Sequence, residues 1–173
     1  MPDVDVLVVG AGPAGSIAAL EAQRAGPGLD VLLVERDRAV GAPVRCAEGV
    51  GDAGLREFAN PDGAPWAARK ITRVIFLAPD DTEVKVAERD VGWILDRTRF
   101  DAFLAGVAVA AGAQLSVGTE ATGMVRTSDG RWAVSIRGPG GVDTIRARVV
   151  IGADGVETMV GRWAGLDTRV PSR

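Results

Sequence analysis

The chain has 173 residues, enough for one domain, or one domain with an excursion, that buries about 70% of its unfolded surface. Its net charge of −3 disfavours nucleic acid as the main partner, and no apolar run reaches the roughly 18 residues that would span a membrane. With no histidine and a single cysteine, histidine-based acid–base catalysis and an internal disulfide are excluded, and we expect no metal site. No signal-peptide pattern precedes the first strand, so we expect a cytoplasmic protein.

The first 35 residues carry the strongest pattern in the chain. An apolar run at 4–9 predicts a strand, which leads into a G-x-G-x-x-G turn at 10–15 and an alanine-rich stretch at 16–25 that predicts a helix. A second apolar run at 31–34 predicts a strand that ends on Glu35. Strand, glycine turn, helix, strand and acid in this order predict a dinucleotide-binding βαβ unit.

Each position of this unit has a chemical role in such a site. Gly10 allows a tight turn, Gly12 leaves no Cβ between the backbone and a pyrophosphate, and Gly15 lets the helix pack closely on the sheet. The free N–H groups and partial positive charge of the helix N-terminus attract the phosphates. Glu35 is spaced to accept the hydroxyls of an adenosine ribose. The remaining candidates of this unit are Pro13, Ala14 and Arg36.

The rest of the chain predicts an α/β fold, in which β structure between residues 60 and 95 forms an excursion into a second layer. Asp96 or Thr98 is expected to cap a long helix. The expected helices cover 51–58, 96–111 and a segment that ends at 164, and the expected strands cover 71–77, 82–87, 92–95, 114–117, 121–126, 132–137 and 142–151.

Three further groups each admit two interpretations. Cys46, in the loop after Glu35, is either a small half-buried thiol without a role or a contact to a redox ring, and Arg45 is either an anion clamp or a surface charge. Arg97 either pairs with Asp101 one helical turn on or reaches a cofactor. Asp154, in the turn 152–155, either caps the following helix or holds a loop against the cofactor.

Four stretches in order resemble the geranylgeranyl reductase family, which includes the archaeal-type digeranylgeranylglycerophospholipid reductases. They are residues 10–16, 41–50, 95–101, and 152–157 with 161–165. The first and last are common among FAD hydroxylases, whereas the Pro-Val-Arg-Cys-Ala-Glu-Gly block at 43–49 is much more specific. The resemblance implies a Rossmann-like FAD-binding domain of glutathione-reductase type with an adjoining antiparallel β layer. It also implies FAD contacts from Arg45, Cys46, Ala47, Gly49, Arg97, Ala121, Asp154 and Gly155.

The same resemblance implies a reaction. FAD, recharged by NAD(P)H or another reductant, would hydrogenate isolated C=C bonds of an isoprenoid lipid by hydride from N5 of the reduced flavin, with Cys46 as a catalytic candidate. Cys46, Glu48 or water could supply the proton. Peripheral membrane contact is implied only by the lipid substrate. The alternatives are an FAD-dependent monooxygenase and a non-catalytic dinucleotide-binding fragment.

Family members are considerably longer than this chain, and their second half carries a further FAD-binding motif and most of the substrate tunnel. We therefore expect a fragment that is completed by a missing C-terminal half, with incomplete FAD binding by itself.

Overall fold

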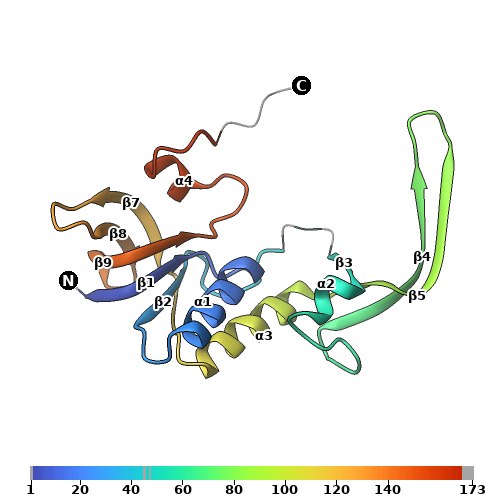
Figure 1. The fold of residues 1–173 in the computed structure, drawn as a ribbon, viewed down its shortest axis with the longest axis horizontal. Helices are drawn as coiled ribbons and strands as arrows, with labels where there is room; N and C mark the ends of the chain where they lie inside the picture. The colour runs from blue at the N-terminus through green and yellow to red at the C-terminus, as the bar shows by residue number, and fades with distance from the viewer. Residues whose placement is uncertain (1, 45, 47, 169–173) are drawn as a thin grey trace. The chain divides into compact units, whose positions relative to one another are not determined.

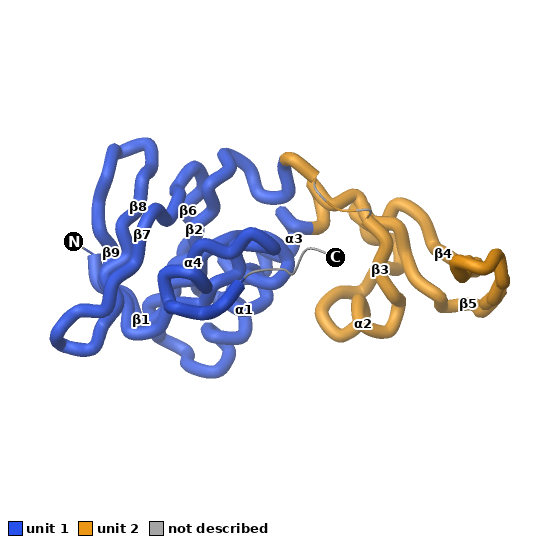
Figure 2. The backbone as a smooth tube through the Cα atoms, turned by 90° about the horizontal axis from the view of Figure 1, so that it is seen from above, with its two compact units in different colours: residues 1–42, 101–173 blue, residues 43–100 orange. Residues whose placement is uncertain are grey.

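The computed structural model describes residues 2–44, 46 and 48–168. The chain divides into two compact units: unit 1 comprises residues 1–42 and 101–173, and unit 2 comprises residues 43–100 (Figure 2). Unit 2 is therefore inserted into unit 1, and the excursion expected at 60–95 lies within it. No helix in the described part of the chain is long and apolar enough to cross a membrane.

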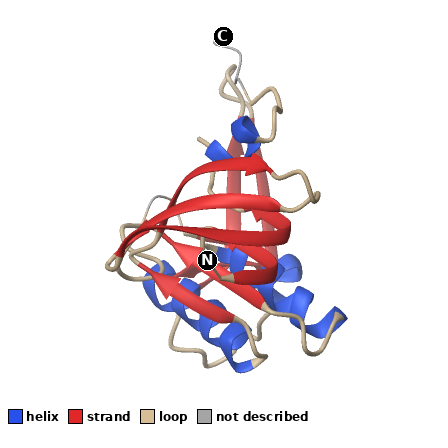
Figure 3. Ribbon diagram, turned by 90° about the vertical axis from the view of Figure 1, so that its left-hand side faces the viewer, coloured by secondary structure: helices blue, strands red, loops and turns tan. Residues whose placement is uncertain are grey.

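Unit 1 is built on a six-stranded mixed sheet with the order β6-β2-β1-β9-β8-β7. The first four of these strands are mutually parallel, and β9, β8 and β7 form an antiparallel meander (Figure 3). In sheet order the strands are β6 (Gln114–Val117), β2 (Val31–Glu35), β1 (Asp3–Val9), β9 (Gly141–Gly152), β8 (Trp132–Gly138) and β7 (Glu120–Arg126). The α/β fold class expected from the sequence is confirmed.

The side chains on the two faces of the central strand β1 belong to two different apolar clusters. Val6 and Val8 pack in a cluster with residues of α1 (Pro13–Ala25) and with Ala108 of α3 (Arg97–Ala110). Leu7 and Val9 pack with the meander strands and with Val160 of α4 (Met159–Trp163). Burial on both faces explains the nearly continuous apolar sequences of β1 and β2, since parallel strands are covered on both sides.

Unit 2 contains a second, three-stranded antiparallel sheet with the order β3-β5-β4. It comprises β3 (Gly49–Gly51), β4 (Ala67–Leu77) and β5 (Glu83–Leu95), with the short helix α2 (Asp52–Arg56) between β3 and β4 (Figure 1). Its small core includes the rings of Trp66 and Phe100, whose centroids lie 4.9 Å apart, together with buried Leu55, Trp93 and Leu95.

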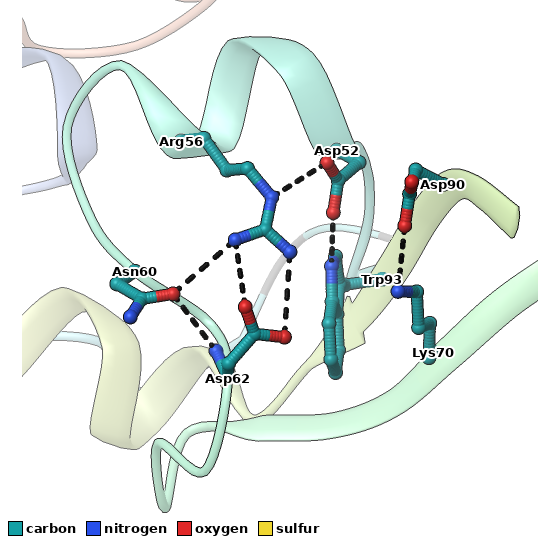
Figure 4. A network of polar contacts seen from close by, with 7 residues as sticks. All are labelled: Asp52, Arg56, Asn60, Asp62, Lys70, Asp90 and Trp93. Atoms are coloured by element: carbon teal, nitrogen blue, oxygen red, sulfur yellow. Dashed lines mark hydrogen bonds and ion pairs between the residues drawn. The ribbon is translucent and has the colours of Figure 1, made fainter.

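A polar network ties α2 to β5 and to the turn that follows the helix (Figure 4). The buried carboxylate of Asp52 accepts hydrogen bonds from Arg56 Nε and from Trp93 Nε1, each at 2.7 Å. Arg56 also pairs with Asp62 at 2.8 Å. Hydrogen bonds from Arg56 and then from Trp93 hold the pKa of Asp52 below its usual value, so the carboxylate stays ionised at neutral pH.

Asp52→Asn should lower the unfolding temperature at neutral pH and lose this effect in acid. Because the folded-state pKa of Asp52 lies below its unfolded value, its charge stabilises the fold above about pH 4, and this stabilisation is lost as the pH falls through the lowered value. Thermal melts of variant and wild type, followed by tryptophan fluorescence at neutral and acid pH, measure the difference. Asp90→Asn is the control, because Asp90 pairs with Lys70 in an exposed ion pair and should matter little. Equal effects of the two substitutions would contradict the prediction.

Several element boundaries differ from those predicted. α1 begins at Pro13, directly after the glycine turn, rather than at residue 16, since Pro favours the first helical position. The strands expected at 82–87 and 92–95 are one strand, β5, because a register shift against β4 accommodates the polar residues between them. The helix expected at 51–58 is shorter and is preceded by β3.

Candidate nucleotide-binding site

The candidate site lies at the carboxyl edge of the parallel strands of unit 1. β1 has β2 on one side and β9 on the other, so the strand order reverses at β1, which is where open α/β sheets bind ligands. The turns after β1, β2 and β9 meet at this edge. Gly10 N donates to Val34 O at 2.8 Å, and Ala153 N donates to Val9 O at 2.8 Å.

Two glycines of the first turn are required by close backbone packing. Gly10 has φ +100°, and a Cβ there would lie 2.4 Å from the Ala153 carbonyl oxygen. A Cβ on Gly15 would lie 1.8 Å from the carbonyl oxygen of Gly10. Any side chain at either position would therefore push the turn after β1 away from α1 or from the turn after β9.

Gly12 has the opposite surroundings. A Cβ there would meet no atom within 4 Å, and its φ of −66° is open to every residue type. Fold packing therefore does not require glycine at this position, whereas a phosphate group approaching the backbone would. The open space beside Gly12 fits a bound pyrophosphate.

The N-terminus of α1 is left available for an anion. Gly12 is the N-cap and offers no side-chain hydrogen bond, and the first turn, which begins with Pro13 and Ala14, contains no acidic residue. The first-turn N–H groups have no partner within the helix, and the helix dipole adds partial positive charge. The fully buried Ser16 donates its hydroxyl to Ala11 O at 3.1 Å and braces the turn from within.

Glu35 is held beside the glycine turn by its own carboxylate. Oε2 accepts a hydrogen bond from Ala11 N at 2.8 Å and Oε1 accepts one from Asp37 N at 2.9 Å. A carboxylate has about four lone-pair positions, so capacity remains for two ribose hydroxyls. The residues present therefore fit a dinucleotide: a diphosphate at Gly12 and the α1 N-terminus, and a ribose at Glu35. Arg36 follows with an exposed side chain.

Asp154 organises the neighbouring turn. Its Oδ2 accepts hydrogen bonds from Met159 N at 2.6 Å and Val160 N at 2.9 Å, the first two N–H groups of α4, whereas the N-cap residue itself is Thr158. Partial burial acts to raise the pKa of Asp154, but hydrogen bonds from Thr158, Val160 and Met159 outweigh it, and the net pKa lies below the usual value. Gly155, at φ +86°, completes the turn.

The structure brings Gly10, Gly12, Gly15, Glu35 and Asp154 to one edge of unit 1. Ala121 belongs to the same unit, in β7, where it pairs with Ile136. Pro13, Ala14, Arg36 and Gly155 also lie in unit 1, and the remaining candidates belong to unit 2 or to the residues not described. Cys46 is exposed, Gly49 opens β3, and Arg97 opens α3; Arg45 and Ala47 lie outside the described residues.

Three residues that shape the candidate site were not predicted from the sequence. Ala11 supplies the N–H that holds Glu35, Ala153 supplies the carbonyl that faces Gly10, and Thr158 caps α4 by accepting from Gly161 N at 3.0 Å. Only Thr158 left a signal, because a threonine before a short helix is a common N-cap. Ala11 and Ala153 act through their backbone groups, and the type of a residue does not indicate what its backbone contacts. Among the described residues, no three His, Cys, Asp or Glu side chains are grouped to hold a metal ion.

This edge defines unit 1 as a dinucleotide-binding module of the parallel α/β class. The family model described as "FAD binding domain" matches residues 3–173. The chain therefore belongs to the FAD-binding domain family.

Comparison with individual proteins shows which members of this broad family the chain resembles. The digeranylgeranylglycerophospholipid reductase of Methanocella arvoryzae is 47% identical over 170 residues, which cover 96% of this chain and 43% of that relative. The solved structure of a geranylgeranyl bacteriochlorophyll reductase-like protein from Thermoplasma acidophilum has a TM-score of 0.86 at 35% identity, over 99% of this chain and 44% of that one. An anhydrotetracycline hydroxylase from Streptomyces rimosus superposes with a TM-score of 0.74 at 26% identity, over 95% of this chain and 34% of that one. The resemblance to geranylgeranyl reductases is confirmed, and the chain spans less than half the length of these relatives.

Proposed function

We propose that this chain is the nucleotide-binding part of an FAD-dependent reductase that hydrogenates C=C bonds in the isoprenoid chains of a lipid. The observation that carries the proposal is the 47% identity, over 96% of the chain, to a digeranylgeranylglycerophospholipid reductase. The glycine turn with its open position at Gly12, beside a fixed Glu35, supports a dinucleotide cofactor. NAD(P)H is proposed as the source of electrons, and transient contact with a membrane surface as the route to the lipid.

Bound FAD would supply the hydride chemistry at its reduced ring. The residues of this chain would bind and orient that cofactor. The N-terminus of α1 would hold its diphosphate, and Glu35 its ribose. Asp154 would keep the turn after β9 in place beside Gly10, because its carboxylate fixes the start of α4.

The unactivated alkene offers no carbonyl to polarise, so orientation of the isoprenoid against the flavin has to supply most of the rate enhancement. We propose that Cys46, Gly49 and Arg97 of unit 2 contact the cofactor or substrate, together with Arg45 and Ala47. Cys46 is exposed, as a contacting thiol must be, and it is a candidate donor of the proton to the second alkene carbon. Glu48 and water are the other candidate donors.

A hydroxylase is the second candidate function, supported by the 26% identity to anhydrotetracycline hydroxylase. The two reactions differ in the molecule with which the reduced flavin reacts. A hydroxylase consumes oxygen and inserts an oxygen atom, whereas a reductase adds only hydrogen and works without oxygen.

The test uses a hybrid in which this chain replaces the matching part of the Methanocella arvoryzae reductase. We expect the hybrid to retain FAD through desalting and, with dithionite as reductant and no oxygen, to add hydrogen across the double bonds of a geranylgeranyl lipid, as measured by mass spectrometry. Flavin retention without any hydrogenated product would overturn the reductase proposal while leaving the nucleotide site intact. In a separate assay in air, with NAD(P)H in place of dithionite, oxygen consumption with hydroxylated product would favour the second candidate.

A matched pair of variants tests whether the thiol of Cys46 donates the proton. If Cys46 donates the proton, Cys46→Ala should slow product formation in the hybrid more than it weakens FAD binding, and Cys46→Ser should restore part of the rate. Equal rates in all three proteins would remove Cys46 from the mechanism and leave Glu48 or water.

A further inference from the structure

Ser16 is fully buried in the first turns of α1 and makes two hydrogen bonds to consecutive carbonyl groups of the glycine turn. Its hydroxyl donates to Ala11 O at 3.1 Å, and its backbone N–H donates to Gly12 O at 2.9 Å. The hydroxyl bond is not one of the backbone bonds of the helix, and alanine is the better helix former. Formation of α1 therefore does not explain the serine.

The hydroxyl bond restrains a peptide group that has little else to hold it. The Ala11 carbonyl belongs to the peptide group that joins Ala11 to Gly12. Gly12 has no Cβ to limit rotation of this group, and a Cβ built there would meet no atom within 4 Å. The glycine that leaves room for a phosphate thus also loosens the turn, and the Ser16 hydroxyl restores its rigidity.

The direction of the Ala11 carbonyl determines the direction of the Gly12 N–H. In a planar trans peptide group the C=O and N–H bonds point in opposite directions. Since the carbonyl points to the buried Ser16 hydroxyl, the Gly12 N–H points away from it. This N–H donates to no acceptor among the residues that the structure describes.

The N–H groups on either side cannot replace the Gly12 donor. Ala11 N–H is already bonded to Glu35 Oε2 at 2.8 Å, and Pro13 has no N–H. The Gly12 N–H is therefore a single donor, whose aim depends on the peptide group that Ser16 holds.

We propose that Ser16 is a positioning residue for the diphosphate of the bound dinucleotide: its hydroxyl holds the Ala11–Gly12 peptide group so that the Gly12 N–H faces a phosphate oxygen. The inference rests on the dinucleotide cofactor of the proposed function. Ser16 itself is buried and acts through Gly12. Because hydrogen bonds to charged groups are stronger and more directional than those between neutral groups, a tilt of this peptide group should weaken FAD binding measurably.

The test measures FAD affinity by flavin fluorescence in the hybrid with the Methanocella arvoryzae reductase. Ser16→Ala should weaken binding by about tenfold or more, the scale of one lost charge-assisted hydrogen bond. Ser16→Thr, which keeps the hydroxyl, should retain most of the affinity. Phosphorus NMR of bound FAD reads the diphosphate directly, and Ser16→Ala should shift at least one of its two signals from their positions in the unsubstituted hybrid.

Gln23→Met is the matched control for a merely structural effect. Gln23 is buried near the opposite end of α1, and its side-chain amide donates to Leu29 O at 3.0 Å. The substitution removes a side-chain hydrogen bond to a carbonyl group without touching the glycine turn. It should lower the unfolding temperature while FAD affinity and the phosphorus signals remain those of the unsubstituted hybrid.

Three results would overturn this proposal alone. Equal FAD affinity in Ser16→Ala and the unsubstituted hybrid would remove Ser16 from diphosphate binding. Equal losses of affinity in Ser16→Ala and Gln23→Met would assign the effect to the stability of α1. A folded Ser16→Thr hybrid that binds FAD no better than Ser16→Ala would exclude the hydroxyl as the cause.

If Ser16→Thr does not fold, the phosphorus signals of Ser16→Ala decide, and unshifted signals would overturn the proposal. An unsubstituted hybrid that binds no FAD would overturn the proposed function and this inference together. Binding of FAD by the unsubstituted hybrid therefore distinguishes the two failures.

Discussion

Gly12→Val should abolish FAD binding while the protein stays folded. The position has no neighbour within 4 Å and an extended backbone, with φ −66° and ψ −177°, that a β-branched residue adopts readily. The added methyl groups would occupy the space through which a pyrophosphate approaches the helix N-terminus. Loss of one or two charge-assisted hydrogen bonds, each about 1.5–3 kcal/mol, corresponds to a fall in affinity of about tenfold to 10,000-fold.

Quenching of flavin fluorescence during titration of the hybrid with the Methanocella arvoryzae reductase measures the affinity, and a thermal melt measures stability. The unfolding free energy should change by about 1 kcal/mol or less, the scale of a poorer N-cap residue. Gly106→Val, in α3, is the control, because Gly106 also has open space around its Cβ position but lies outside the candidate site. Unchanged FAD affinity in Gly12→Val would place the pyrophosphate elsewhere.

Gly15→Ala should destabilise unit 1 strongly, although the new side chain is a single methyl group. Its Cβ would lie 1.8 Å from the carbonyl oxygen of Gly10 and 3.2 Å from the Ala153 Cβ. The first of these neighbours is backbone and cannot rotate away, so α1 must shift from the turn after β1. Overpacking of this kind costs about 1–3 kcal/mol and sometimes more, and we expect about 3 kcal/mol because the clash is with main chain.

Urea denaturation of the variant and the wild type measures this loss. Gly106→Ala is the matched control: the same substitution, in an exposed helical position with open space, should stabilise the chain by up to about 1 kcal/mol. Opposite signs for the two glycine-to-alanine changes are the expected outcome. A Gly15→Ala protein as stable as the wild type would mean that α1 does not pack as closely on β1 as described.

Local signals in the sequence were enough for β1, α1, β2 and β6. β1 and β2 are apolar runs, α1 and β6 have glycines beside their ends, and the parallel layer follows from the order of these elements. β5 could not be predicted as one strand, because Glu88, Arg89 and Asp90 break the apolar pattern; they lie where the register against β4 shifts between the pairs Ile71–Gly92 and Arg73–Ala87. Apolar spacing in the long helix does not fix the depth of each side chain, because Phe103 is 40% exposed whereas Leu104 and Ala108 of α3 are buried.

The candidate site was predictable where side-chain identity matters and unpredictable where the backbone acts. Gly10 and Gly15 were identified by spacing, and the close approaches at both positions give the physical reason for glycine. The donors that hold Glu35, the N–H groups of Ala11 and Asp37, depend on how two turns meet in space. The same holds for Asp154, whose sequence context allowed either a cap or a cofactor role, and whose hydrogen bonds to α4 emerge only in three dimensions.

In the proposed dinucleotide site, the fixed carboxylate of Glu35 would also act as a filter on which nucleotides can enter. Both of its oxygens are already anchored to main-chain N–H groups, so it cannot swing aside for a ligand that repels it. A ribose with free hydroxyls satisfies its remaining lone pairs, whereas a 2′-phosphate would bring a second anion against it. NADPH is therefore expected to be a poor occupant of this edge.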